Sequence, residues 1–297
     1  MNEPKVLGKF ARLYVSKITK FGVMLRSFEE KDLEVLLPNN QVKKGTEKGD
    51  FYEVFLFVSG RAEYIIEGKT YALRPGDILL TNDRELHRPL VEPGRLYERY
   101  VLWIRPEYIR KLQEDGTDLA ACFVDAARRE YKRIRPGGEL IARLMRLCGR
   151  LEEVYGGSAY GCRVLERAYV MELLVYLNRA YFETAEELVP DVVENQKINA
   201  VVEYINRHLD ADLSLDALAG RFYVSKYHLS RQFKQYIGVP IHQYITKKRL
   251  MTARGMLRRG QPVRSAYLES GFNDYANFSK AFKAEFGLSP KDYVRQL

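Results

Sequence analysis

The hydrophobic residues change their spacing once along the first two thirds of the chain. From Phe51 to Ile104, short aromatic and β-branched runs alternate with Gly and Pro turns, as in FYEVFLFVSG, RAEYII, KTYAL and LYERYVLWI. This pattern is typical of a small antiparallel β-barrel or sandwich. From Pro106 to Phe182 the spacing becomes helical, which predicts flanking helices.

Two apolar stripes mark those helices. One comprises Leu140, Leu144, Leu147 and Leu151, and the other Val164, Ala168, Met171, Leu174, Val175 and Leu177. Because apolar stripes usually face a core, we expect a helix pair that covers the barrel, and part of the second helix is also a candidate for pairing with a second copy of the chain. Residues 184–195 are acidic and contain Pro190, which prevents a continuous helix, and we interpret them as a linker.

The segment Gly271–Pro290, GFNDYANFSKAFKAEFGLSP, predicts a short helix with one aromatic face. Asp274 can cap its start and Gly287 can end it. The aromatic residues recur every four positions, at Phe278, Phe282 and Phe286. The opposite face carries small, amide and basic groups, which suits a DNA major groove, although many helices with lysines on their wet face bind no nucleic acid.

An internal repeat favours the interpretation as a DNA-binding segment. A shift of 49 positions (274 minus 225) aligns Ser225–Lys234 with Asp274–Lys283 and superposes Gly238 on Gly287. The chain therefore contains two helix-turn-helix units. Residues 240–259 between them predict a helix of ~30 Å, close to the ~34 Å between successive major-groove faces. This length favours binding by both units over one working unit with a decayed copy.

Formal charge is concentrated in the same region. Residues 196–297 contain 17 Lys and Arg against 8 Asp and Glu, a net of +9, whereas residues 1–195 contain 31 of each and sum to zero. A basic surface confined to one domain is typical of a protein that displaces counterions from phosphates.

Residues 196–297 resemble the tandem helix-turn-helix DNA-binding domain of AraC-type transcriptional regulators. The family signature, GF-x-D-x-x-x-F-x-x-x-FK-x-x-x-G-x-S-P, is matched from Gly271 to Pro290. Tyr267 is a departure, because the family usually has a small residue four positions before the glycine. The resemblance implies groove-facing positions in both units, at Tyr227, Ser230, Arg231, Ala276, Asn277 and Lys280.

Side-chain chemistry suggests roles for these positions. Arg231 can form two hydrogen bonds with guanine, and Asn277 can pair similarly with adenine. Tyr227 is either a thymine-methyl contact or a partly buried surface aromatic, and His228 is expected to pack on the buried side. Three lysines are expected to contact phosphates, namely Lys226, Lys234 and Lys283.

The barrel region, about residues 35–104, is similar to the cupin-like sensor domain of many AraC-type regulators. The matching pieces are Glu53, PGDILL from Pro75, and His87. Metal-binding cupins carry an H-x-H pair ahead of the glutamate, where this chain has Glu47, Lys48 and Gly49. Because His87 is the only histidine before residue 208 and imidazoles are the usual ligands of a catalytic metal, we expect no metal and no cofactor.

Strand alternation brings a candidate effector site together. Arg99 and Trp103 share one face of LYERYVLWI with Tyr97 and Val101, and Glu53 shares a face of FYEVFLFV with three phenylalanines. If both faces line the barrel, they can bind a polar organic molecule stacked on a ring. The predicted site comprises Glu53, His87, Arg99 and Trp103. A structural ion pair between Glu53 and Arg99 is the alternative.

The cysteines and the N-terminal sequence indicate in which cellular compartment the protein resides. Cys122, Cys148 and Cys162 lie outside any CxxC motif and are expected to be buried or half-buried thiols. Their odd number, with no cleavable N-terminal apolar stretch and no run long enough to cross a bilayer, indicates a cytoplasmic protein without a membrane anchor.

The combined prediction is an α+β protein. An N-terminal domain, 1–183, holds a cupin-like antiparallel β-barrel (about 35–104) with helices at about 106–183, and serves effector binding and dimerisation. A linker, 184–195, leads to an all-α domain, 196–297, in which a long helix joins two helix-turn-helix units.

We expect this chain to be a transcription regulator and not an enzyme. Its expected partners are a promoter site in double-stranded DNA, a small-molecule effector such as a sugar, RNA polymerase, and a second copy in a homodimer. The alternative is a cupin-type metal-dependent enzyme with an appended DNA-binding domain, which bound metal in the purified protein would identify. An architectural DNA binder without a ligand is a third class, but it leaves the sensor-like sequence unexplained.

Overall fold

The computed structural model describes residues 51–82, 84–91, 97–113, 116–129, 131–155, 157–183 and 195–297, together with the backbone of residues 23–28, 184 and 192–194. Residues 35–50 of the predicted barrel, which include Glu47, Lys48 and Gly49, lie outside the described residues. So do residues 185–191 of the predicted linker.

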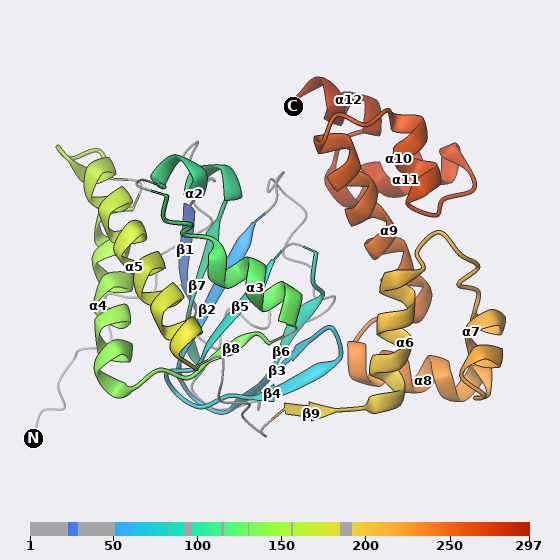
Figure 1. The fold of residues 1–297 in the computed structure, drawn as a ribbon, viewed down its shortest axis with the longest axis horizontal. Helices are drawn as coiled ribbons and strands as arrows, with labels where there is room; N and C mark the ends of the chain where they lie inside the picture. Colours follow the sequence, from blue (N-terminus) through green and yellow to red (C-terminus); the bar gives the residue numbers. More distant parts are fainter. Residues whose placement is uncertain are drawn as a thin grey trace, which may run out of the picture.

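Two antiparallel sheets form the centre of the N-terminal part (Figure 1). The first has the strand order β1-β7-β2-β5-β8, with bounds β1 (Val23–Phe28), β7 (Glu98–Ile104), β2 (Tyr52–Ser59), β5 (Ile78–Asn82) and β8 (Arg133–Ile134). The second has the order β6-β3-β4-β9, with bounds β6 (His87–Val91), β3 (Ala62–Ile66), β4 (Lys69–Ala72) and β9 (Val192–Glu194).

The prediction of a closed barrel is wrong, because the strands form two open sheets. Among the described strands, no ladder joins one sheet to the other. The chain leaves the first sheet at Gly60 and returns to it after Pro75 and Gly76. Both glycines have positive φ, 113° and 94°, and the proline lacks the N–H that a continuing ladder would need. The domain is therefore built as a sandwich.

Three strands lie outside the predicted barrel range. β1 precedes it, β8 falls within the range predicted to be helical, and β9 occupies the end of the predicted linker. β8 pairs with β5, and β9 pairs with β4. Strands of two or three residues are too short to show a period in the sequence, so the periodicity could not reveal β8 and β9.

Glu67 and Gly68 form the turn of a tight β-hairpin in the second sheet. These two residues join β3 to β4, with Ile66 opposite Lys69. Their φ values are 48° and 89°, and positive φ at both positions is the requirement of a type I′ turn. The turn places the Glu67 carboxylate at the tip of the second sheet.

Helices cover the outer face of the first sheet, and the second sheet covers its inner face (Figure 1). The covering helices are α2 (Pro106–Leu112), α3 (Ala121–Arg129), α4 (Gly138–Val154) and α5 (Cys162–Thr184). Alternate residues of β2 separate the two cores, since Val54 packs under the helices and Phe55 packs between the sheets.

The two predicted apolar stripes differ in outcome. The stripe on α4 is confirmed, with Leu144 and Leu151 buried and Leu140 packed against the same core. The stripe on α5 is buried only in its later part, as at Leu177, because the buried face of the helix starts with Glu166 and Val170 and leaves the earlier stripe positions outside it. Val164 there is 70% exposed.

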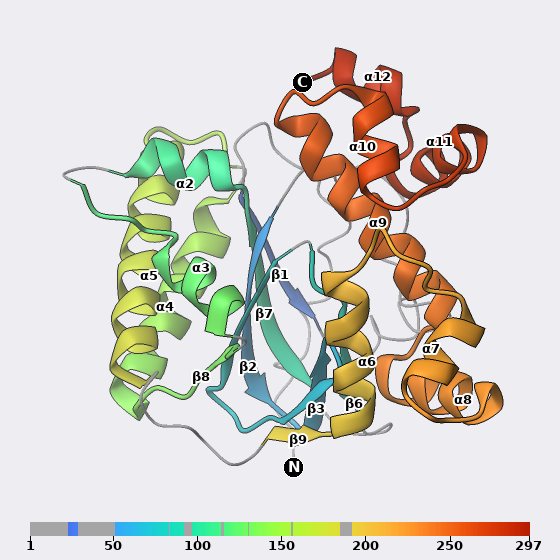
Figure 2. The ribbon, with the colours of Figure 1, turned by 45° about the vertical axis from the view of Figure 1, so that its right-hand side comes forward.

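The predicted all-α region with two helix-turn-helix units is confirmed (Figure 2). Its helices are α6 (Gln196–Arg207), α7 (Leu215–Arg221), α8 (Lys226–Ile237), α9 (Ile241–Arg258), α10 (Val263–Glu269), α11 (Tyr275–Phe286) and α12 (Pro290–Arg295). α7 and α8 form the first unit together with α6, and α10 and α11 form the second together with α12. α9 is the long connecting helix.

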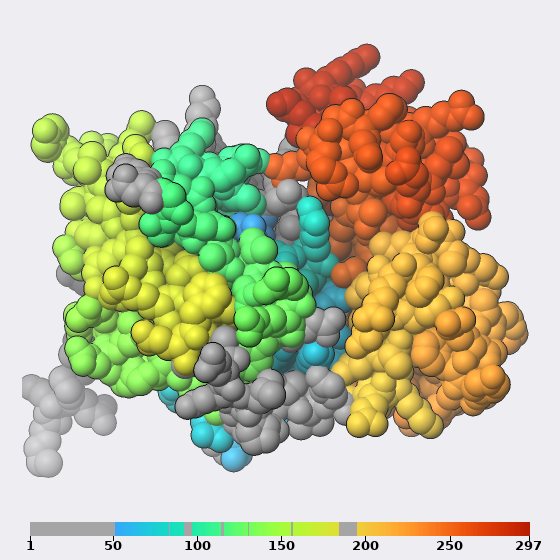
Figure 3. All heavy atoms as spheres, viewed as in Figure 1, coloured from blue at the N-terminus to red at the C-terminus, as the bar shows by residue number. Residues whose placement is uncertain are grey.

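Each unit has its own hydrophobic core, and α9 contributes to both. Tyr244 and Ile245 of α9 belong to the first core, with Phe233 of α8. Leu250 and Leu257 of α9 belong to the second, with Phe282 of α11. The C-terminal part lies on the opposite side of the sheets from α4 and α5, as the space-filling view also shows (Figure 3).

Candidate functional site

α8 and α11 are built in the same way. The side chain of Ser225 accepts a hydrogen bond from the His228 N–H at the start of α8, and that of Asp274 accepts one from the Asn277 N–H, at 2.8 Å, at the start of α11. Gly238 and Gly287 end the helices in the left-handed conformation, with φ of 89° and 75°. The caps and stops that the sequence repeat predicted are therefore confirmed.

Burial also repeats between the two helices. Leu229 and Phe233 are buried on α8 in the positions that Phe278 and Phe282 occupy on α11. Of the predicted DNA-contacting residues, one is half-buried, Ser230. The others are exposed, namely Lys226, Tyr227, Arg231, Lys234, Ala276, Asn277, Lys280 and Lys283. The two helices therefore present the predicted side chains to solvent on one face each.

Three details of these helices bear on the predicted roles. Tyr227 is 76% exposed, so it is not partly buried. His228 is exposed, and the expectation that it packs inward is wrong because Leu229 fills the buried position at the start of α8. Lys226 forms an ion pair with the exposed Asp216 of α7.

Tyr267, the departure from the family signature, is accommodated by aromatic packing. Its ring centroid lies 5.6 Å from that of Tyr275 and 5.8 Å from that of Phe278. Such pairs favour the folded state beyond the area they bury. The second unit thus holds a large residue where the family has a small one.

In the sensor part, Glu53 is the centre of a polar cluster between the two sheets. Its carboxylate accepts a hydrogen bond from Trp103 Nε1 at 2.6 Å and lies 3.3 Å from His87 Nε2. The Tyr64 hydroxyl donates to the same carboxylate at 3.4 Å. Trp103 stands directly opposite Glu53 in the β2–β7 register, and His87 comes from β6 of the other sheet.

The charges of Glu53 and His87 stabilise each other. Burial alone would raise the pKa of Glu53, but the attraction of His87 and the hydrogen bonds it receives lower that pKa. Burial alone would lower the pKa of His87, but Glu53 raises it to about 9. The other ring nitrogen, Nδ1, lies 2.9 Å from the Glu85 carbonyl oxygen, so both nitrogens face acceptors, as an imidazolium requires.

The structure brings the predicted effector residues Glu53, His87 and Trp103 into direct contact. Arg99 lies nearby with its guanidinium 4.7 Å from the centre of the Tyr97 ring, and its charge helps to lower the pKa of Glu53. Sequence reasoning missed Tyr64, whose alternation with Ala62 and Ile66 in RAEYII could have placed it inward.

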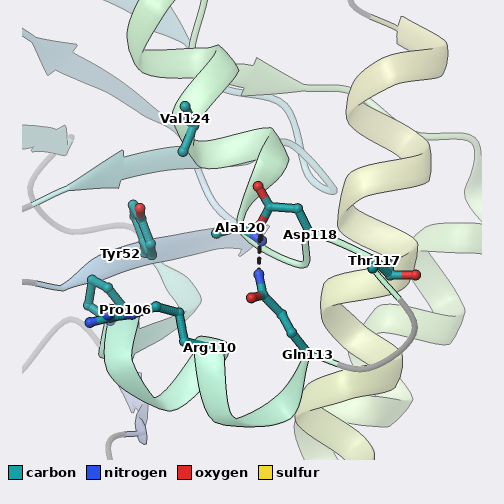
Figure 4. Close-up of a pocket in the computed structure, with 9 residues that line it drawn as sticks. Tyr52, Pro106, Arg110, Gln113, Thr117, Asp118, Ala120 and Val124 are labelled. Carbon is teal, nitrogen blue, oxygen red and sulfur yellow. Dashed lines mark hydrogen bonds between the residues drawn. The ribbon is translucent and has the colours of Figure 1, made fainter.

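A separate cavity of about 560 Å³ opens between α2 and α3 (Figure 4). None of the four predicted effector residues lines it. Its wall includes Tyr52 and Arg110, and Gln113 donates to Asp118 across its edge at 2.8 Å. The predicted effector residues therefore form a closed cluster that lies apart from this open cavity.

Glu67 connects the sensor part to the first helix-turn-helix unit. One carboxylate oxygen accepts a hydrogen bond from the Leu86 N–H at 2.5 Å. The other accepts from Asn206 of α6 at 3.1 Å and from the Tyr244 hydroxyl of α9, and it lies 3.3 Å from Lys248 Nζ. The tip of the β3–β4 hairpin is therefore bonded to two helices of the DNA-binding region.

The four consecutive residues 85–88 lie between the Glu53 cluster and the DNA-binding region, and we call them the relay segment. Glu85 pairs with the buried Lys132, and His87 contacts Glu53. Leu86 packs against the core of the first unit, and Arg88 donates to the Gln235 carbonyl at the end of α8 at 3.4 Å. Odd and even residues point to opposite sides, as in an extended strand.

In the part of the chain that the structure describes, no group of three or more His, Cys, Asp or Glu side chains is arranged to hold a metal ion. No helix in the described ranges is long and apolar enough to span a membrane. All three cysteines are free thiols, Cys122 and Cys148 buried and Cys162 half-buried, as predicted.

Two family models match most of the described chain. The model of the AraC-like ligand binding domain matches residues 39–174, and that of a helix-turn-helix domain matches residues 218–296. A model of the S1 domain matches residues 7–65, of which 52–59 and 62–66 form β2 and β3 in the two sheets.

Individual proteins are similar over most of the chain. The HTH-type transcriptional activator RhaS of Escherichia fergusonii is 26% identical over 249 residues, 83% of this chain and 86% of that protein. RhaS of Salmonella schwarzengrund is 28% identical over 252 residues, with the same coverage. Among solved structures, ToxT from Vibrio cholerae is 13% identical and covers 93% of this chain and 99% of its own, with a TM-score of 0.35.

The pairing of His87 with Glu53 predicts a pH dependence of stability. A histidine whose pKa is about 9 in the folded protein stabilises the fold fully below its unfolded value of ~6.5, and this contribution is lost as the pH rises through about 9. Thermal unfolding of the full-length protein between these pH values should show a steeper fall than that of Glu53→Gln, in which the attraction is absent. His228→Gln, which removes an exposed imidazole, is the control and should follow the wild type. Equal slopes for the wild type and Glu53→Gln would contradict the ion pair.

Proposed function

Because the chain belongs to the AraC-type transcriptional regulators, DNA-binding proteins with a ligand-binding domain, we propose that it binds a small polar effector at the Glu53 cluster and alters its occupancy of a promoter site in response. The observation that carries this proposal is the relay segment, whose residues contact the cluster on one side and the first helix-turn-helix unit on the other.

The cluster has the chemistry to recognise a hydroxyl-rich organic molecule such as a sugar. Glu53 can accept hydrogen bonds, His87 and Arg99 can donate them, and Trp103 offers a ring for stacking. A ligand hydroxyl that bonds to the Glu53 carboxylate competes with the His87 imidazolium. Displacing His87 moves the relay segment with its neighbours Leu86 and Arg88, and so changes their contacts with α8 and the first core.

At the promoter, α8 and α11 enter successive major grooves, with α9 setting the distance between them. Arg231 reads a guanine and Asn277 reads an adenine. Tyr227, Ser230, Ala276 and Lys280 complete the base-facing surfaces. Lys226, Lys234 and Lys283 hold phosphates and fix the register without reading sequence.

Regulation of transcription adds two further partners to the proposal. RhaS is named a transcriptional activator, and we infer that this chain contacts RNA polymerase at the promoter. A second copy of the chain pairs through the exposed start of α5, where Val164 and Leu165 lie in open solvent with Tyr160 just before them. Basic Arg163 and Arg167 precede acidic Glu172 on this helix, so an antiparallel copy about a two-fold axis brings opposite charges together. We expect the protein to act in the cytoplasm, where the promoter DNA is.

Arg231→Ala should reduce affinity for the specific site by ~1–3 kcal/mol and relax the preference at one base position, because a bidentate base contact is lost. Lys234→Ala should weaken binding to specific and random duplexes alike and reduce the salt dependence. Both can be measured by titration of the full-length protein with selected and scrambled DNA at several salt concentrations. An equal loss on both duplexes for Arg231→Ala would refute its assignment to a base.

Thermal-shift screening of the full-length protein against sugars and related metabolites should identify a stabilising effector, because a ligand that binds only the native state raises the melting temperature by mass action. Glu53→Gln and Arg99→Met should abolish the shift and the effector's influence on DNA binding. Arg110→Met, in the α2–α3 cavity, should leave both intact. The reverse pattern would place the effector in the cavity. Variants of Glu53 or Arg99 that melt without any effector-specific defect would make the cluster purely structural.

Val164→Glu should dissociate the dimer, since it places a charge in the centre of the proposed contact. Light-scattering mass of the full-length protein at micromolar concentration should change from two chains to one. Val294→Glu, on an exposed apolar residue of α12, is the control and should leave the mass unchanged. A wild-type protein that is monomeric with and without effector would contradict the proposal.

A further inference from the structure

The two helix-turn-helix units are held by separate cores, so their relative orientation depends on what joins them. α9 packs in the first core as far as Ile245 and in the second core from Leu250 onward. Arg249 lies between these two stretches, directly before Leu250. Its side chain is half-buried and leaves α9 where one core ends and the other begins.

Arg249 is bonded to the backbone of the first unit. Its Nε donates to the Leu209 carbonyl oxygen at 2.8 Å, and its Nη2 donates to the Ala211 carbonyl oxygen at 3.0 Å. Both carbonyls belong to the connection that follows α6. A planar guanidinium with two donors can hold two backbone oxygens at once, which a lysine cannot do in the same geometry.

Gly271 of the second unit lies against the same two residues, Leu209 and Arg249. It follows α10 with φ of 91°, and a Cβ added to it would overlap the Leu209 carbonyl oxygen and lie 2.7 Å from Arg249 Nε. The backbone of the second unit therefore approaches the first as closely as the absence of a side chain permits. Beside this contact, a cavity of about 530 Å³ lined by both units, at Asp212 and Asn273 among others, keeps the contact narrow.

We propose that Leu209, Arg249 and Gly271 form a joint that fixes the distance and rotation between α8 and α11, and so sets the spacing of the two half-sites that the protein accepts on DNA. The inference rests on the proposed binding by both units. B-DNA turns once in 10–10.5 base pairs, so one inserted pair rotates a half-site by about 35°. A rigid joint cannot follow that rotation, whereas a loose one can.

The test begins with a duplex selected from random sequence by the wild-type full-length protein. Derived duplexes carry one or two base pairs inserted between the two half-sites, or one half-site alone. Wild type should lose about tenfold or more in affinity for each inserted duplex, equivalent to about 1.4 kcal/mol. Arg249→Met should bind the selected duplex more weakly, but its loss on insertion should shrink to about threefold or less. Its affinity for single half-sites should stay at the wild-type value, since α8 and α11 keep their own cores.

Gly271→Ala approaches the joint from the second unit and should also reduce the insertion penalty. Arg259→Met is the matched control, because it removes one positive charge from the exposed end of α9, and it should keep the wild-type penalty. If Arg249→Met keeps the full penalty while binding half-sites normally, the joint is refuted and binding by both units stands. If wild type itself shows no penalty, both the joint and binding by both units are refuted.

Discussion

The carboxylate of Glu67 is the interaction on which the relation between the two parts of the chain depends. It stands at a tight hairpin tip whose backbone already requires the left-handed conformation. A carboxylate removed from water must be paired, and its partners come from the sensor backbone at Leu86 and from Asn206, Tyr244 and Lys248. Tyr244 also belongs to the core of the first unit, and burial together with Glu67 raises its pKa well above the usual value. The core of that unit is thus bonded directly to the sensor sheet.

The contact at Glu67 also connects the relay segment to the first helix-turn-helix unit. Leu86 donates to Glu67 while its side chain packs on the first unit, and its neighbour His87 neutralises Glu53 between the sheets. The buried carboxylate of Glu53 and the half-buried carboxylate of Glu67 are therefore linked through adjacent residues of one extended segment. If Glu53 changes its pairing with His87, the neighbouring Leu86 must shift relative to Glu67, because packed interiors deform little. The second unit has its own contact with the sensor part, between Arg258 and Glu107, and it is joined to the first unit through α9 and at Gly271.

Local features of the fold were predictable from the sequence, and long-range ones were not. Ser225, Asp274 and the glycines after α8 and α11 act within one helical turn, so their residue types and spacing determined the helix ends. His228 was misplaced because one residue along a helix separates the buried position from the exposed one. The prediction of a barrel failed because closure of a barrel depends on pairings between strands that are distant in the sequence. Strand alternation predicted which face carries Glu53, Arg99 and Trp103, whereas the contact of Glu67 with α6 and α9 had no local sign at all.

Strand β9 has a consequence for how the protein can be divided. The predicted linker ends in this strand, and β9 forms the edge of the second sheet beside β4. Cutting the chain before it strips β4 of its neighbour and leaves a row of unpaired N–H and C=O groups, the arrangement through which sheets associate edge to edge. A sensor fragment that stops at residue 190 is therefore prone to self-association for reasons unrelated to biological assembly, and a fragment that extends through Asn195 keeps that edge covered.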